Sequence, residues 1–183
     1  FMHAPLFHPA LKTVGPIRKN LGLRTFFNML GPMVNPASPK FQLVGVYSLE
    51  MARIYNYLLQ QTGNAFTIIH GLDGYDEISL TNDTKVITNE GEKIKTPLEL
   101  GKRFVEAEAI YGGNTTEEAA NIFKKIINGE GSWAQNAVVL ANAAMALQCT
   151  GDYKNYDDAY NAAVESLESG KANGVLQKLI SLQ

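Results

Sequence analysis

The sequence has little cysteine and no excess of basic residues, and these two absences exclude several classes of protein. Its single cysteine, Cys149, cannot form an internal disulfide and offers too few ligands for a cysteine-based zinc site. A lone thiol of this kind is typical of a cytoplasmic protein, and it predicts a small buried side chain rather than a nucleophile. The 16 basic and 18 acidic side chains give a net charge of −2, so the basic excess of a nucleic-acid-binding protein is missing.

Long hydrophobic runs are also missing. The most apolar stretch, residues 137–149, is too short to cross a bilayer and contains Asn142, so we expect no membrane span. The chain begins with Phe1, and its first residues are neither an initiator methionine nor a charged signal-peptide start. We therefore expect a fragment of a longer protein. Hydrophobic residues still make up 45% of the chain, which is enough to form a core and excludes a disordered tail.

A run of turn residues at 35–39 separates two parts with different patterns. Before it, apolar side chains recur every three or four residues over 10–21, which predicts a helix that starts or kinks at Pro16. A second short helix is predicted over 24–30. Residues 41–47 and 65–70 have the pattern of buried strands, with an amphipathic helix predicted between them over 48–62. A strand, a helix and a strand in this order predict parallel pairing with a right-handed crossover.

The rest of the chain is predicted to contain a hairpin and then helices. The hairpin pairs residues 84–88 with 93–96 through a turn at 89–92. The helices are expected after the capping box at 115–118 and over 133–148, 156–169 and 174–182. The predicted fold class is α/β, with a mostly parallel central sheet flanked by helices and preceded by a short helical segment.

Three carboxylates follow the second predicted strand within five positions, at Asp73, Asp76 and Glu77. Open parallel sheets bind ligands beyond the carboxyl ends of their strands. Neighbouring Asp76 and Glu77 could reach a hard cation or its waters, and Mg²⁺ typically binds one or two carboxylates together with substrate phosphates. Solvated acidic loop residues explain the same spacing equally well.

Arg18 and His8 are the basic candidates of the first segment. Arg18 shares a helical stripe with Val14 and Leu21, and a half-buried arginine suits bidentate capture of a carboxylate or phosphate. The periodicity alone favours a surface arginine whose stem packs on apolar neighbours. His8, which precedes a proline, could donate a proton, contact a ligand or cap a turn, and the sequence favours the turn.

Segments along nearly the whole chain together resemble the anthranilate phosphoribosyltransferase family. They are HPALK at 8–12, PIRKNLGLRT at 16–25, FN at 27–28, LGPMVNP at 30–36, GVY at 45–47, HG at 70–71, GYDEIS at 74–79, GGN at 112–114, NAA at 142–144 and SGKA at 169–172. The resemblance implies a nucleoside-phosphorylase-like fold, with part of a small helical domain at 1–36 and a large α/β domain at 37–183. It implies transfer of the phosphoribosyl group of phosphoribosyl pyrophosphate to anthranilate, with release of pyrophosphate, in tryptophan biosynthesis. It also implies a homodimer.

The resemblance also implies roles for individual residues. Arg18 matches the arginine that binds the anthranilate carboxylate. His8, Ala4 and Pro5 match the wall of the anthranilate channel. Asp76 and Glu77 match the acidic pair that binds Mg²⁺.

One departure from the family pattern limits these expectations. The glycine-rich GTGGD loop and the KHGN segment, which bind the phosphoribosyl pyrophosphate in the family, do not occur in this sequence. We expect them upstream of Phe1, and we expect the 183-residue chain alone to lack transferase activity. The alternatives are a non-catalytic, nucleic-acid-binding paralogue of the same fold and a relative of the pyrimidine-nucleoside phosphorylases. The net charge of −2 does not support the first, and the signature segments of the second are not found.

Overall fold

A computed structural model of the chain describes residues 4–22, 27–101 and 103–182. By its internal contacts the chain divides into two units, Phe1–Pro39 and Lys40–Gln183. The assignment of the first unit to a small helical domain stays a prediction.

The first unit is helical wherever it has regular structure. Its elements are α1 (Ala4–Phe7), α2 (Pro9–Leu21), α3 (Phe27–Leu30) and the 3₁₀ helix η1 (Gly31–Met33). The predicted helix over 10–21 is confirmed as α2, which begins one residue earlier because Pro9 suits the first turn of a helix. The helix runs through Pro16 and ends at Gly22, whose left-handed backbone lets its N–H bond the carbonyl of Arg18. The predicted helix over 24–30 lies partly outside the described residues, and its described part is α3.

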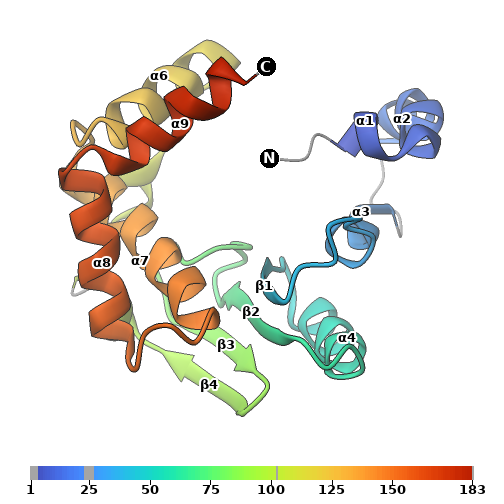
Figure 1. The fold of residues 1–183 in the computed structure, drawn as a ribbon, viewed down its shortest axis with the longest axis horizontal. Coiled ribbons are helices and arrows are strands. Elements are labelled where there is room, and N and C mark those ends of the chain that lie inside the picture. Colours follow the sequence, from blue (N-terminus) through green and yellow to red (C-terminus); the bar gives the residue numbers. More distant parts are fainter. Residues whose placement is uncertain (1–3, 23–26, 102, 183) are drawn as a thin grey trace. The chain divides into compact units, whose positions relative to one another are not determined.

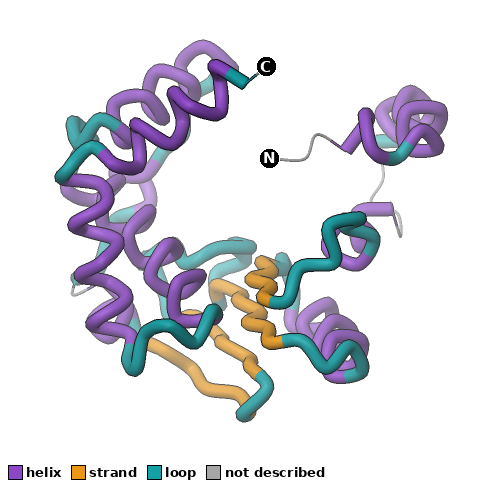
Figure 2. Tube along the Cα trace, in the orientation of Figure 1, coloured by secondary structure: helices purple, strands orange, loops and turns teal. Residues whose placement is uncertain are grey.

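The second unit is built on a four-stranded sheet with the order β1-β2-β3-β4 (Figures 1 and 2). The strands are β1 (Phe41–Gly45), β2 (Ala65–Gly71), β3 (Thr84–Thr88) and β4 (Gly91–Lys95), and α4 (Leu49–Gln60) connects β1 to β2. As predicted, β1 and β2 are parallel, and β3 and β4 form an antiparallel hairpin, although β4 begins at Gly91 and the turn is therefore shorter than the predicted 89–92.

The α/β class is confirmed, but the expectation of a mostly parallel sheet is wrong. Among the described strands, β2 pairs with β3 antiparallel, so only the β1–β2 pairing is parallel. A parallel return would need a crossover, usually a helix, between the two strands. Residues 72–83 contain no described helix, so the chain turns back directly and β3 runs against β2.

Helices α5 (Pro97–Gly101), α6 (Thr116–Ile127), α7 (Trp133–Cys149), α8 (Tyr156–Glu168) and α9 (Lys171–Ser181), with the 3₁₀ helix η2 (Ala107–Ile110), complete the unit. The four predicted helices are confirmed as α6 to α9, and α9 begins three residues earlier than expected. The sequence did not predict α5 or η2. Helix α7 starts at a full capping box in which Ser132 and Gln135 bond each other's backbone N–H. None of the described helices is long and apolar enough to cross a membrane.

The core lies between the sheet and α7. Ile69 of β2 and Val86 of β3 pack in one buried cluster with Ala137, Ala141 and Met145 of α7. Helix α4 covers the opposite face of the sheet (Figure 1) and buries Met51, Ala52, Tyr55 and Leu59. Successive side chains of β2 point to opposite faces of the sheet, so β2 contributes side chains both to the layer with α7 and to the layer with α4. The sheet is therefore fixed from both sides.

Tyr156 of α8 connects three helices of this core. Its hydroxyl lies 2.8 Å from the carbonyl oxygen of Leu100, in α5, and 3.1 Å from that of Ala141, in α7. One hydroxyl proton therefore serves two carbonyl acceptors. Burial, followed by the nearby Tyr160 and Asp157, raises the pKa of Tyr156 above its ordinary value. The neutral side chain is thus the form that the fold selects.

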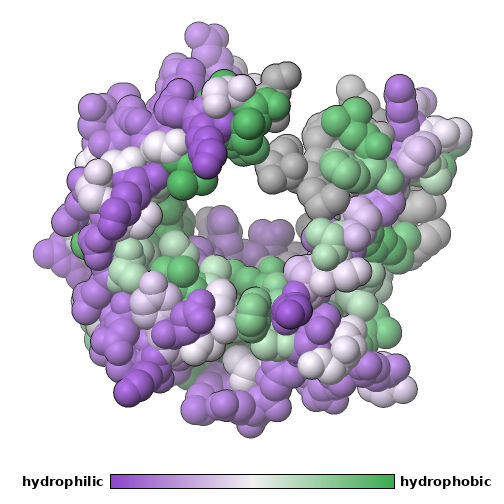
Figure 3. All heavy atoms as spheres, in the orientation of Figure 1, coloured by the Kyte–Doolittle hydropathy of each residue, from purple (hydrophilic) through white to green (hydrophobic). Residues whose placement is uncertain are grey.

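Helices α6 and α9 bury fewer side chains than α7 does. Helix α6 has no buried residue, although it carries apolar side chains such as Phe123, which is 50% exposed. Val175, Ile180 and Leu182, in and just after α9, are also exposed, and hydrophobic atoms gather near the C-terminus in Figure 3.

Candidate functional site

Residues 72–83, which we call the acidic loop, connect β2 to β3 at the carboxyl ends of β1 and β2. Two short bonds shape its start: the N–H of Gly71 donates to the carbonyl of Tyr75, and the N–H of Gly74 donates to the carbonyl of Gly71, both at 2.9 Å. Gly74 has a φ of 102°, a conformation that favours glycine. The loop therefore begins with a compact turn that fixes the backbone between Gly71 and Tyr75.

The loop lies directly on the end of β1. A Cβ atom built on Gly45 would lie 1.6 Å from the carbonyl oxygen of Asp76. No side chain fits there, so the glycine allows the backbone of the acidic pair to approach the strand.

Asp73 has a structural role in the loop. Its Oδ2 accepts a hydrogen bond from the hydroxyl of Thr81. The same hydroxyl lies 2.7 Å from the Oγ of Ser79, which also accepts the N–H of Thr81. This carboxylate is therefore engaged within the loop.

Asp76 and Glu77 are different. Within the described parts of the chain, neither carboxylate has a hydrogen bond or an ion pair, and both residues are exposed. Partial burial first, and then the negative charge of Asp76, raise the pKa of Glu77. A cation shared by the two carboxylates would offset the repulsion that Asp76 exerts on the charged form of Glu77. Among the described residues no cluster of three or more potential protein ligands occurs, so a cation here would need further oxygen ligands from another source.

Behind the acidic pair, residues 78–80 form a buried anchor. The side chains of Ile78, Ser79 and Leu80 are all fully buried. Leu80 has a φ of 61°, and its side chain fills the space over Gly101, where a Cβ atom would lie 2.1 Å from its Cδ1. A non-glycine residue in this conformation is strained, and it persists only where its surroundings determine it. The acidic pair is therefore followed by a firmly held segment.

Asn142 of α7 bonds both polar backbone groups of Ile78. Its Oδ1 accepts the N–H of Ile78 at 3.0 Å, and its Nδ2 donates to the carbonyl of Ile78 at 2.8 Å. In the sequence, Asn142 stands out as a polar residue in an apolar stretch and as the first residue of the NAA segment, but its contact with Ile78 was not predicted. A polar residue inside an apolar helix was the signal for this contact.

His70 joins the two parallel strands at the same edge. Its Nδ1 lies 2.8 Å from the carbonyl oxygen of Val46, so Nδ1 carries the proton and donates it. The N–H of Val46 in turn donates to the carbonyl of Ile69 at 2.9 Å. The carboxyl ends of β1 and β2 are therefore fixed together beside the acidic loop.

The other predicted site residues belong to the first unit. Ala4 and Pro5 lie in α1, and their side chains are outside the described part. His8 is the N-cap residue of α2, but its side chain makes no capping bond, so the favoured turn role is not performed by the imidazole. Arg18 lies half-buried in the last turn of α2. His8 and Arg18 are therefore about 15 Å apart along the helix axis, at a rise of 1.5 Å per residue.

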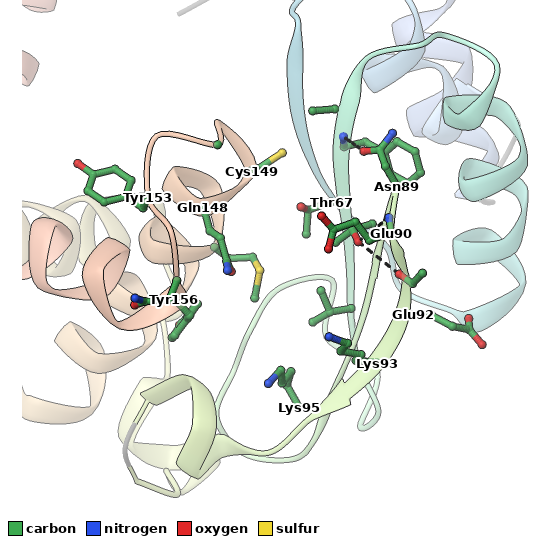
Figure 4. Close-up of a pocket in the computed structure, with 18 of the residues that line it drawn as sticks. Thr67, Asn89, Glu90, Glu92, Lys93, Lys95, Gln148, Cys149, Tyr153 and Tyr156 are labelled. Atoms are coloured by element: carbon green, nitrogen blue, oxygen red, sulfur yellow. Dashed lines mark hydrogen bonds between the residues drawn. The ribbon is translucent and has the colours of Figure 1, made fainter.

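An open cleft of about 1020 Å³ lies at the end of the sheet opposite the acidic loop (Figure 4). It is lined by the first residues of β2, the β3–β4 hairpin and the connection between α7 and α8. Its lysines, Lys93, Lys95 and Lys154, are matched by Glu90, Glu92 and Glu99. Lys95 is also paired with Glu99 at 2.8 Å. The cleft has no excess of one charge that would select a ligand, so the acidic loop is the stronger candidate site.

Comparison with known proteins points to one family. The model of the glycosyl transferase family, a/b domain, matches residues 1–173. The anthranilate phosphoribosyltransferase of Flavobacterium johnsoniae is 56% identical over 181 residues, covering 99% of this chain and 54% of the relative. That of Bacteroides thetaiotaomicron is 51% identical over 182 residues, covering 100% of this chain and 55% of the relative. The chain thus spans about half the length of these relatives.

Solved structures are similar over the same extent. Anthranilate phosphoribosyltransferase from Thermus thermophilus superposes with a TM-score of 0.84 and 31% identity, covering 95% of this chain and 52% of that one. The enzyme from Saccharomyces cerevisiae in complex with PRPP and Mg has a TM-score of 0.82 and 27% identity, covering 93% of this chain and 49% of that one.

Proposed function

The chain belongs to the glycosyl transferase family, and from this membership we propose that it is part of an anthranilate phosphoribosyltransferase of tryptophan biosynthesis. The observation that carries the proposal is the alignment of 99% of the chain, at 56% identity, with an enzyme of that name. Because the chain spans about half of that relative, the activity is proposed for a protein of the relative's length that contains this chain. The unpaired carboxylates at the carboxyl edge of the sheet, within the described residues, support it independently.

In the proposed reaction, the bond between C1 of the ribose and pyrophosphate breaks, a bond forms between C1 and the amine nitrogen of anthranilate, and that nitrogen releases one proton to the departing pyrophosphate or to water. The aromatic amine is unprotonated at neutral pH, so the residues of this chain need not supply a strong base. Arg18 would grip the planar carboxylate of anthranilate with its planar guanidinium and so orient the amine. His8, Ala4 and Pro5 would form the wall along which anthranilate enters.

Asp76 and Glu77 are the proposed magnesium ligands. The donor set fits the ion, because both groups are hard oxygen donors and neither is engaged by a described residue. Bound Mg²⁺ would neutralise the charge that develops on departing pyrophosphate. Asp76 and Glu77 would hold the ion at the carboxyl edge, while Asp73 stays bonded to Thr81 and shapes the loop.

A chimera tests the proposal. This chain would replace the matched residues of the Flavobacterium johnsoniae enzyme, and the loss of anthranilate fluorescence would be followed with phosphoribosyl pyrophosphate and Mg²⁺. We expect an active chimera, and the Asp76→Asn/Glu77→Gln variant should be slower by about 100-fold or more, since charge on the leaving group is no longer offset. The control, Glu106→Gln/Glu108→Gln, removes two exposed carboxylates elsewhere and should keep full activity. Equal rates in the two double variants would remove the acidic pair from the mechanism.

The remaining expectations about the whole protein are also proposals. They comprise phosphoribosyl pyrophosphate and anthranilate as ligands, a homodimer, no nucleic-acid partner and a cytoplasmic location. The nucleic-acid-binding paralogue is disfavoured by the net charge of −2.

A further inference from the structure

We infer that Asn142 is a positioning residue that holds Asp76 and Glu77 at the carboxyl edge of the sheet. The use of this positioning, to hold a metal-binding pair, rests on the proposed function. The hydrogen bonds from which the inference is drawn do not depend on that function. Asn142 does not touch the acidic side chains, and it acts through the backbone of the next residue, Ile78.

The amide of Asn142 uses both of its N–H groups and its oxygen. Nδ2 donates to the carbonyl oxygens of Ile78 at 2.8 Å and Val138 at 2.9 Å, and Oδ1 accepts the N–H of Ile78 at 3.0 Å. A flipped amide would place N–H groups against the N–H of Ile78 and its oxygen against two carbonyls. The partners therefore fix a single orientation of the side chain.

The contact with Asn142 matters for the position of Ile78 because Ile78 is fully buried. Its N–H and carbonyl cannot turn to water, so the Asn142 amide is what satisfies them. Ile78 directly follows Glu77, while the carbonyl of Asp76 lies against Gly45. The acidic pair is thus held between a contact with β1 and a two-bond contact with α7.

Asn142 belongs to a helix that is packed in the core and capped at its start. It lies in the interior of α7, beside the buried residues Ala141 and Ala144, in a helix with a full capping box at its start. Asparagine is a poor helix former, because its side chain competes for backbone hydrogen bonds. Its place inside an apolar helix is explained by the distant bond to Ile78 rather than by the helix itself.

Hydrogen exchange of the purified chain tests the positioning directly. In the wild type, we expect the amide of Ile78 to be protected, although its neighbours at 73–77 are exposed. In Asn142→Ala, exchange at Ile78 and in the acidic loop should rise at least tenfold, while β2 keeps its protection. Asn121→Ala makes the same change at an exposed position of α6 and should alter neither. A wild-type Ile78 amide that exchanges as fast as that of Tyr75, or a variant loop that exchanges like the wild type, would overturn the inference.

Binding of Mn²⁺ alone, followed by electron paramagnetic resonance, gives a second readout. Asn142→Ala should weaken Mn²⁺ binding at least fivefold. Asn142→Asp, which keeps an acceptor for the N–H of Ile78, should fall between wild type and Asn142→Ala in loop protection. If both variants lose protection in β2 as well, the role is general stability and the inference fails. If Asp76→Asn/Glu77→Gln binds Mn²⁺ as tightly as the wild type, the proposed metal site fails, whereas the exchange data still decide the role of Asn142.

Discussion

Gly45 and Asp76 meet backbone to backbone, at a distance that leaves no room for even a methyl group between them. Gly45 is the last residue of β1, and Asp76 belongs to a loop that begins only after β2. The contact therefore determines where the acidic pair lies relative to the sheet.

Gly45→Ala should disturb this contact. The new Cβ would lie 1.6 Å from a backbone oxygen that cannot rotate away, so the loop or the strand must move. We expect the free energy of unfolding in urea to fall by about 1–3 kcal/mol, and binding of Mn²⁺ to weaken. Gly174→Ala is the control: its Cβ would meet nothing within 4 Å, and alanine should stabilise α9 by about 0.5–1 kcal/mol. Unchanged stability and metal binding in Gly45→Ala would contradict the contact.

Gly101→Ala should act through Leu80. A Cβ at position 101 would lie 2.1 Å from Cδ1 of Leu80, which is fully buried and has little space to move. The expected loss is about 1–3 kcal/mol in the wild type and close to zero in a Leu80→Ala background. A double-mutant cycle measured by chemical denaturation checks this, and additive effects of the two substitutions would argue against the contact.

Tyr156→Phe should cost about 1–2 kcal/mol at neutral pH, because two buried carbonyls lose their shared donor. The raised pKa of Tyr156 also has a consequence at alkaline pH. The unfolded chain releases the phenol proton near the ordinary pKa of about 10, whereas the folded chain retains it. Wild-type stability should therefore be lost as the pH rises above about 10, and less steeply in Tyr156→Phe. Tyr57→Phe, at a side chain that is 70% exposed, should behave like the wild type.

Glu99 should titrate far below an ordinary glutamate. The side chain of Lys95 is the largest cause, followed by hydrogen bonds from the backbone and side chain of Thr96, and together they lower the pKa of Glu99 to about 2. A carboxyl whose pKa is lower in the folded chain than in the unfolded chain stabilises the fold at pH values above its ordinary pKa. This contribution is lost as the pH falls toward 2. Carboxyl NMR shifts should report this titration, and Lys95→Met should raise the pKa of Glu99. An ordinary pKa in the wild type would show that the Lys95–Glu99 pair does not persist in solution.

The sequence predicted those features that depend on neighbouring residues. Periodicity and caps located α2, α4 and the helices α6 to α9, and alternation with turn residues located the strands. The match over residues 1–173 shows membership of the glycosyl transferase family, and the resemblance to anthranilate phosphoribosyltransferases agrees with relatives such as one that is 56% identical over 181 residues. The mixed sheet was missed because strand direction was inferred from one strand–helix–strand unit, whereas β2 and β3 are joined without a described helix.

The site was predictable only in part. The adjacency of Asp76 and Glu77 and their place after a strand are visible in the sequence. Asp73 is bonded to Thr81, which lies eight positions away in the sequence. The backbone of Ile78 is bonded to the side chain of Asn142, which lies 64 positions away. Contacts at such separations form only on folding, so the sequence can show an unusual residue, such as Asn142 in an apolar helix, but it does not show that residue's partner.

The last strand of the sheet, β4, has consequences for crowded solutions. One side of β4 has no partner strand in the described sheet, which leaves backbone groups available to another molecule. Lys93 and Lys95 lie on the face of the sheet that α7 covers, in register with Val86 and Thr84. A foreign strand added here would have to pair beside these two lysines, of which Lys93 is exposed and Lys95 is partly buried and bonded to Glu99. Short length and these charges together disfavour edge-to-edge aggregation, so the hairpin can stay exposed without seeding fibres.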